Sequence, residues 1–342
     1  MANLNYTQRL SNLQNRKFDR ALNESVMSKS LSSSLMPENV KYLLESMRPI
    51  DQKYNAKTIE AADRVQKHLE SKFQLTFSRA YRTQGSVKTQ TNIRVHSDFD
   101  LLSIIDNYYY TETSNGGSNY GGKPDFDIQE LRKQAVAILK NIYDEVDNSN
   151  EKCVTIFNKD LYRKVDVVFG FWYNSNKFQE TKDEYYRGVH LYKFPVGPKK
   201  DQDFPFALIH QVNQKGDTTF DGSRRGIRLL KTLKADSDVE IKVVKSFHLT
   251  SIVHSISNTE LFYRPSKELE IAKSISNELD KIISSDDYRK SIKSPHGTEY
   301  PLFNSDVIPD LKSLKNDLDT LIVDCAKEIM HSPLIRNAVE SY

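Results

Sequence analysis

Two apolar segments in the first half of this 342-residue chain carry aspartates where an ordinary buried strand would carry none. In VHSDFDLLSIID (95–106), Asp98 and Asp100 alternate with apolar side chains, and in RKVDVVFGF (163–171), Asp166 stands between valines. Side chains two residues apart on a strand point to the same face. Both segments are therefore predicted to be strands that are apolar on one face and present aspartates on the other, toward a shared cleft.

These three aspartates require a positive partner. Two carboxylates a few ångströms apart repel each other, and a carboxylate in an apolar strand is costly to desolvate unless it is paired or metal-bound. Mg²⁺ and Mn²⁺ prefer oxygen ligands and would neutralise all three groups. An isolated D-x-D pair more often marks a solvated strand end. The third aspartate on a later strand favours a metal site at Asp98, Asp100 and Asp166.

A Gly-Ser turn precedes the acidic pair. Ser86 lies 12 residues before Asp98, and Gly85-Ser86 follows QLTFSRAY (74–81), a segment with strand character. A Gly-Ser turn that opens a helix offers backbone N–H groups and a hydroxyl to a phosphate, although ordinary turns also use this pair of residues. Combined with the three aspartates, the turn indicates a phosphate beside the metal.

The pattern of apolar residues changes near residue 190. Before it, strand-like segments alternate with helical ones, and beyond Pro195 only helical periodicity remains. The predicted helices of this second half are 204–214, 222–236, 244–258, 265–285 and 308–331. We therefore expect three parts, with the ligand in a cleft between the last two. They are an N-terminal helical or flexible segment (1–54), a catalytic lobe (55–190) and a helical lobe (191–342).

Residues 107–126 have the composition of a flexible loop, with four glycines among serines and asparagines. The loop leaves the strand that carries Asp98 and Asp100, so its root is expected near the cleft. Loops in that position commonly act as lids or contact partners. An inert insertion is the alternative.

Composition excludes several classes of protein. With 49 basic and 46 acidic residues, the formal net charge of +3 argues against stable duplex-DNA binding. Cys153 and Cys325 are far apart, so neither a disulfide framework nor a cysteine-rich zinc site is expected, and a reducing cytoplasm is the natural compartment. The polar N-terminus and the absence of a long apolar run predict neither a signal peptide nor a membrane partner.

The segments GSVKTQTNIRVHSDFDLL (85–102) and VDVVFGF (165–171) together resemble the core of the polymerase-β-type nucleotidyltransferases. The TNI-x(3)-SDxD form is most similar to the bacterial CD-NTases, relatives of cyclic GMP-AMP synthase and oligoadenylate synthetase. SRRGIRLLKTLKAD and KSFHLTSIVHSI extend the resemblance over about residues 55–260. It implies an α+β, bilobal polymerase-β-like fold with a mixed-sheet catalytic lobe and a helical C-terminal lobe. Val87 and His96 depart from the family's usual residues.

The resemblance also implies roles for individual residues. Asp98 and Asp100 would hold two Mg²⁺ ions, for which Mn²⁺ could substitute, and Asp166 would bind the metal facing the acceptor hydroxyl and help to deprotonate it. The residues implied in binding the nucleotide triphosphate are Gln84, Gly85 and Ser86 on one side, and Lys231 and Ser246 from the helical lobe.

Lys231 has a second argument from helical geometry. Arg224, Arg228 and Lys231 share an arc of about 60° on a helical wheel, opposite the apolar side chains. Such a basic stripe is often a solvated face. Since the cleft must also neutralise a triphosphate, we favour the phosphate-binding interpretation and regard Lys234, at the edge of the apolar side, as structural.

The implied reaction is attack of a ribose 2′- or 3′-hydroxyl on the α-phosphate of an NTP, with release of pyrophosphate. The product would be a cyclic di- or trinucleotide that serves as a second messenger in anti-phage defence. Two alternatives remain open, namely transfer to another acceptor such as an antibiotic or RNA, and a non-catalytic relative that only binds nucleotides. NTPs are the expected ligands, and a regulatory protein partner has no identifiable site in the sequence.

Overall fold

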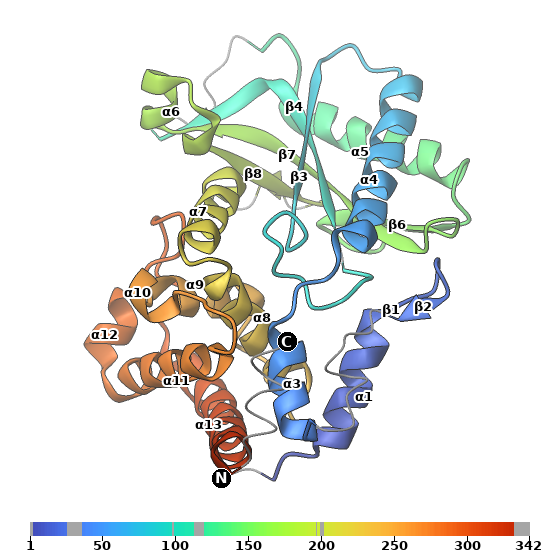
Figure 1. Cartoon of the computed structure of the whole chain (residues 1–342). Coiled ribbons are helices and arrows are strands. Elements are labelled where there is room, and N and C mark those ends of the chain that lie inside the picture. The colour runs from blue at the N-terminus through green and yellow to red at the C-terminus, as the bar shows by residue number, and fades with distance from the viewer. Residues whose placement is uncertain are drawn as a thin grey trace.

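The computed structural model describes residues 3–25, 36–97, 99–112, 120–195, 197–198 and 202–331. A twisted sheet with flanking helices forms one lobe, and a bundle of helices forms the other (Figure 1). This arrangement confirms the predicted fold class, an α+β chain with a mixed sheet followed by a helical lobe.

The sheet is built around two long strands, β4 (Asp100–Thr111) and β7 (Arg163–Asn174), which run parallel. The other strands pair antiparallel in the order β3-β4-β7-β6-β5, and β8 pairs with the second half of β7. Their bounds are β3 (Arg79–Gln84), β5 (Glu145–Asp147), β6 (Cys153–Asn158), β8 (Arg187–Lys193) and β9 (Gly197–Pro198), which pairs with β8. The predicted hairpin between β6 and β7 is present.

The two faces of the sheet differ as the alternation predicts. On one face, Leu101 of β4 and Val167 of β7 lie in a core that is covered by α4 (Gln52–Lys72) and α5 (Pro124–Lys140). On the other face, a smaller apolar cluster contains Leu102, Ile104, Cys153, Val168, Trp172 and Val189. Asp100 and Asp166 each lie two residues before a member of this second cluster, Leu102 and Val168, so their side chains point to the same face of the sheet.

The helices of the second lobe lie where the sequence predicts them. They are α7 (Pro205–Thr218), α8 (Gly222–Ala235), α9 (Ser246–Ser255), α11 (Glu268–Ser284) and α13 (Ile308–His331), with the short helices α10 (Asn258–Leu261) and α12 (Asp286–Ser291) between them. The short helix α6 (Asn176–Thr181) belongs to the sheet lobe, where it contacts β7 (Figure 1). α8 is largely buried, and a Cβ at Gly222 would lie 1.7 Å from the Leu261 carbonyl oxygen, so glycine is required at its start. Across the described ranges, the helices lack the length and apolar character to span a membrane.

The N-terminal segment packs onto the helical lobe. α1 (Tyr6–Lys17) and α3 (Glu38–Met47) contribute to one apolar core together with α8, α9, α11 and α13. In Figure 1, both helices lie beside the helical lobe, below the sheet. Part of the flexible connection predicted after α1, residues 26–35, lies outside the described residues. The three-part division of the chain stays a prediction.

Two boundaries differ from the sequence-based expectation. The strand expected at 74–81 is β3, which begins at Arg79. The loop expected from residue 107 starts later, because β4 continues to Thr111 after a register shift between Ile105 and Tyr109. Tyr108 packs edge-on against Phe171 with ring centroids 5.1 Å apart, which favours the extended strand. Residues 113–119 of this loop lie outside the described residues.

A buried ion pair ties the N-terminal segment to the sheet. The short strand β1 (Phe18–Asp19) carries Asp19, whose Oδ2 accepts from Arg163 Nη2 at 2.9 Å, and neither side chain has any exposed area. Arg163 also donates to Thr58 Oγ1 of α4. Burial acts to raise the pKa of Asp19, but the hydrogen bond and charge of Arg163 outweigh it, so the pKa lies below its usual value.

The segment before the predicted metal ligands is anchored at the same place. His96 lies with Nε2 2.9 Å from the Phe18 carbonyl oxygen and Nδ1 3.0 Å from the Tyr162 carbonyl oxygen. One imidazole thus bridges β1 and the start of β7. The ion pair and the imidazole together hold the start of β7 and the segment before β4 against β1.

We expect Asp19→Ala to lower the free energy of unfolding by about 3–5 kcal/mol, because it leaves the Arg163 guanidinium buried without its counter-ion. Urea denaturation at neutral pH measures the loss. Lys159→Ala is the control, since its ion pair with Asp144 is exposed and should contribute less than about 1 kcal/mol. Equal small losses of unfolding free energy for the two variants would contradict the stabilising role of the Asp19–Arg163 ion pair.

Candidate functional site

A cavity of about 560 Å³ lies between the lobes. Its walls come from the end of β3, the turn that follows it, the start of β4, and helices α7, α8 and α9. Six of the eight residues predicted for the site line it, namely Gln84, Gly85, Ser86, Asp100, Lys231 and Ser246. The fold therefore brings together residues separated by up to 162 positions in the sequence.

The parallel ladder sets the aspartates beside each other. Asp100 is the register partner of Asp166 across β4 and β7, and Gln84 is the partner of Asp100 across β3 and β4. Gln84 Nε2 donates to Asp100 Oδ2 at 3.0 Å, which orients that carboxylate. Asp166 does not line the cavity itself, and Asp98 lies outside the described residues.

Asp166 is held from β6 and from its own strand. Thr155 Oγ1 donates to Asp166 Oδ1 at 2.5 Å, and Lys164 Nζ lies 3.7 Å from Asp166 Oδ2. The Thr155 contact orients the carboxylate, whereas the Lys164 side chain is 42% exposed and makes a longer contact with it. A cation arriving at Asp166 would compete with this ammonium group.

The donor set suits a hard divalent ion. Asp100 and Asp166 present carboxylate oxygens from facing positions of adjacent strands, and Mg²⁺ is commonly bound by one or two carboxylates together with substrate phosphates. Within the ranges that the structure describes, no group of three or more His, Cys, Asp or Glu is gathered around one point. The third predicted ligand, Asp98, lies outside those ranges.

The Gly-Ser segment is a series of turns and not the start of a helix, so that part of the prediction is wrong. Residues 85–90 follow β3 as turns, closed by Lys88 N donating to Gly85 O and Thr91 N donating to Ser86 O. Gly85 has φ +114°, a conformation that side chains disfavour. The turn curls the chain along the cavity wall, where a phosphate could meet its backbone.

Lys231 reaches this turn from α8. Its Nζ lies 3.1 Å from the Thr91 carbonyl oxygen and 3.2 Å from Thr91 Oγ1. Burial, reinforced by the charge of Arg228, lowers the pKa of Lys231 to about 8. The helical lobe thus delivers an ammonium group to the catalytic lobe at the cavity.

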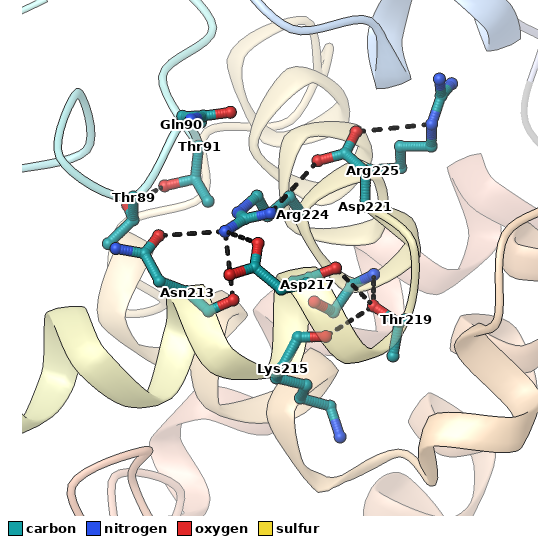
Figure 2. Close-up of polar contacts among 12 residues, drawn as sticks. Thr89, Gln90, Thr91, Asn213, Lys215, Asp217, Thr219, Asp221, Arg224 and Arg225 are labelled. Atoms are coloured by element: carbon teal, nitrogen blue, oxygen red, sulfur yellow. Dashed lines mark hydrogen bonds and ion pairs between the residues drawn. The ribbon is translucent and has the colours of Figure 1, made fainter.

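The neighbouring arginines of α8 make contacts within the helical lobe. Arg224 donates to Asn213 and to Asp217 Oδ1, and Asp221 lies near Arg224 and Arg225 (Figure 2). None of these side chains lines the cavity, so the stripe is not a continuous phosphate-binding surface.

Arg228 and Lys234 are structural as well. Arg228 is fully buried and donates to the carbonyl oxygens of Met47 and Gln90 and to Asp221. Lys234 Nζ contacts the Val244 carbonyl oxygen, which agrees with the structural role predicted for it. Lys231 is therefore the member of the stripe that points into the cavity.

Several cavity residues were not predicted. They are Thr89, Thr91, Asp203, Phe204, Phe247, Thr250, His296 and Glu299. Phe247 lies in the segment that resembles the CD-NTases, next to Ser246, so that resemblance could have pointed to it. Asp203, His296 and Glu299 belong to segments without a motif or periodicity, and only tertiary packing brings them to the cavity.

No family model matches the chain. A c-di-GMP synthase from a Lachnospiraceae bacterium (strain RUG226) is 31% identical over 299 residues, which cover 79% of this chain and 84% of that protein. The similarity thus includes most of both lobes.

Two solved structures are similar over nearly the whole chain. A STING-associated CdnE c-di-GMP synthase from Flavobacteriaceae sp. superposes with a TM-score of 0.81 at 26% identity, covering 94% of this chain and 99% of that one. The corresponding enzyme from Capnocytophaga granulosa gives a TM-score of 0.78 at 27% identity, with coverages of 95% and 100%. Both lobes and their arrangement are thus found in solved structures.

We expect Lys231→Ala to weaken NTP binding at least about tenfold, because a charge-assisted contact to phosphate is lost. Ser86→Ala should weaken it less, since a hydroxyl carries no charge. Isothermal titration with a non-hydrolysable NTP analogue measures both changes. Lys234→Ala is the control that should keep wild-type affinity, and an unchanged affinity for Lys231→Ala would rule out its role.

The lowered pKa of Lys231 predicts a pH dependence of this affinity. A bound triphosphate favours the ammonium form, so below a pKa of about 8 the charge is already present. At higher pH a proton must be taken up on binding, and affinity should fall by up to about tenfold per pH unit. Titrations between about pH 7 and about pH 9.5 should show this fall in the wild type, whereas Lys231→Arg should flatten it.

Proposed function

The chain belongs to the CD-NTase family of nucleotidyltransferases, and we propose that it is a Mg²⁺-dependent synthase that joins two GTP molecules into c-di-GMP. The observation that carries the proposal is the register of Asp100 opposite Asp166, beside a cavity lined by Lys231 and the Gly85-Ser86 turn. The relatives named c-di-GMP synthases support the choice of product. We further propose that the product acts in the cytoplasm as a second messenger in anti-phage defence.

The reaction consists of two similar transfers. In each, a ribose hydroxyl oxygen forms a bond to the α-phosphorus of a second nucleotide, the bond from that phosphorus to the pyrophosphate oxygen breaks, and the hydroxyl proton is lost. The second transfer closes the ring, so two GTP molecules give one c-di-GMP and two pyrophosphates. One site can perform both steps if the intermediate is repositioned between them.

The residues divide this work according to their chemistry. Asp166, oriented by Thr155, is the proposed proton acceptor for the attacking hydroxyl. Lys231 and the backbone of the 85–90 turn would neutralise the departing pyrophosphate. Mg²⁺ bound by Asp98, Asp100 and Asp166 would supply neutralisation of phosphoryl charge and a lower pKa for the hydroxyl.

We expect GTP and Mg²⁺ alone to yield a phosphatase-resistant product with the mass of c-di-GMP. Labelled ATP, GTP, CTP and UTP, singly and in pairs, are incubated with the protein and analysed by mass spectrometry after phosphatase treatment. EDTA should abolish the product, and added Mg²⁺ or Mn²⁺ should restore it. Absence of resistant product from every mixture would refute cyclic dinucleotide synthesis.

We expect Asp98→Asn, Asp100→Asn and Asp166→Asn each to reduce turnover by more than about 100-fold, beyond the range typical of residues that only support metal ligands. Asn is close in size to Asp, so melting temperatures should remain near that of the wild type. Asp144→Asn, an exposed acid of the same lobe, is the matched control. A variant that retains more than about a tenth of wild-type turnover would remove that residue from the proposed metal site.

A further inference from the structure

The cavity has a second set of lining residues that the phosphate chemistry does not use. Phe204, Phe247 and His296 form an aromatic group, in which Phe247 stacks on His296 with centroids 5.7 Å apart and 17° between the planes. The Phe204 ring lies 5.9 Å from the same imidazole. Two carboxylates, Asp203 and Glu299, line the cavity with them. Aromatic walls with a few polar groups are typical of sites for flat, partly polar ligands such as nucleobases.

Asp203 stands on a rigid part of this wall. Its backbone N–H donates to the Val189 carbonyl oxygen at 3.0 Å, and Val189 N–H donates back to the Asp203 carbonyl oxygen at 2.8 Å. These two bonds attach the residue to β8 of the sheet, directly before α7. A carboxylate whose backbone is fixed in this way is suited to select a ligand by geometry.

Asp203 and His296 face the same space from opposite lobes. Both line the cavity, and the ring of Phe204, next to Asp203, lies 5.9 Å from the His296 imidazole. Burial lowers the pKa of His296, and the negative charge of Asp203 acts in the opposite direction. Asp203 is attached to the sheet, whereas His296 lies between α12 and α13 in the helical lobe. A base held between them would therefore bridge the two lobes.

We propose that Asp203 selects guanine by accepting hydrogen bonds from its N1–H and N2–H groups. An ionised carboxylate only accepts hydrogen bonds, and its two oxygens match two adjacent N–H donors. Guanine presents such a pair on its Watson–Crick edge, whereas adenine presents the N1 lone pair at the matching position. The inference rests on the proposed cyclic dinucleotide synthesis and identifies the residue that chooses its base.

Glu299 is the less suitable of the two carboxylates. It lies in a turn closed by Ser294 N–H, which donates to the Glu299 carbonyl oxygen at 2.9 Å. Its side chain has one more rotatable bond, so more conformational entropy is lost when it is held against a base. Glu299→Gln is therefore the matched control for Asp203→Asn, because each variant removes one carboxylate from the same cavity.

Inosine triphosphate provides the sharpest test, because it keeps N1–H but lacks the N2 amino group of guanine. We compare α,β-imido analogues of GTP, ITP and ATP, which cannot release pyrophosphate, by isothermal titration. The wild type should bind the GTP analogue about 10- to 100-fold more tightly than the ITP analogue. Asp203→Asn should reduce this ratio to within about threefold, while Asp203→Glu should keep part of it and Glu299→Gln all of it.

An unchanged ratio of the affinities for the GTP and ITP analogues in folded Asp203→Asn would overturn the assignment. Loss of this affinity ratio in Glu299→Gln alone would overturn it as well. Circular dichroism and melting temperature establish that the variants are folded. Product analysis of the wild type tests the synthase proposal separately. Formation of c-di-GMP together with an unchanged ratio in Asp203→Asn would refute only the role of Asp203.

Discussion

The parallel pairing of β4 with β7 is the constraint on which the geometry of the candidate site depends. Parallel neighbours need a long crossover, and here residues 112–162 supply it with α5 and the strands β5 and β6. The register that results sets Asp100 opposite Asp166. A shift by one residue would turn one of the two carboxylates into the apolar core beneath α4 and α5. The apolar packing of the sheet and the acidic site are therefore fixed by the same ladder.

The two lobes are joined by two chain connections and by side-chain contacts from α8. The chain passes from α3 in the helical lobe to α4 beside the sheet, and it returns from β8 in the sheet to α7 in the helical lobe. Arg228 of α8 reaches the Gln90 carbonyl oxygen, and Lys231 reaches Thr91, so α8 holds the turn that follows β3. This turn forms part of the cavity wall, and so the wall depends on the packing of the helical lobe.

Two fully buried arginines are each paired with an aspartate. The Arg163–Asp19 pair and the Arg228–Asp221 pair each have a guanidinium that is fully buried and that also donates to backbone carbonyl oxygens and, in Arg163, to Thr58 Oγ1. Such cations are expensive to bury and are retained where hydrogen bonds satisfy them. Lys231 differs, because within the described part of the chain its Nζ donates to the carbonyl oxygen and hydroxyl of Thr91 and forms no ion pair, which leaves the ammonium able to meet an anion.

The sequence by itself determined the strands that carry the aspartates, the main helices of the second lobe and which face of the sheet is acidic, because these follow from periods of two and 3.6 in neighbouring residues. It also indicated the aspartates, the Gly-Ser turn and Lys231 as candidate site residues. Periodicity could not separate Lys231 from Arg224 and Arg228, since all three share one side of α8. Tertiary packing decided this, because Arg228 is buried against the distant carbonyl oxygens of Met47 and Gln90, while Arg224 is held by Asn213 and Asp217 of α7. The same packing brought Asp203 and His296 into one cavity, because contacts between distant segments depend on how whole elements fit together and leave no local pattern in the sequence.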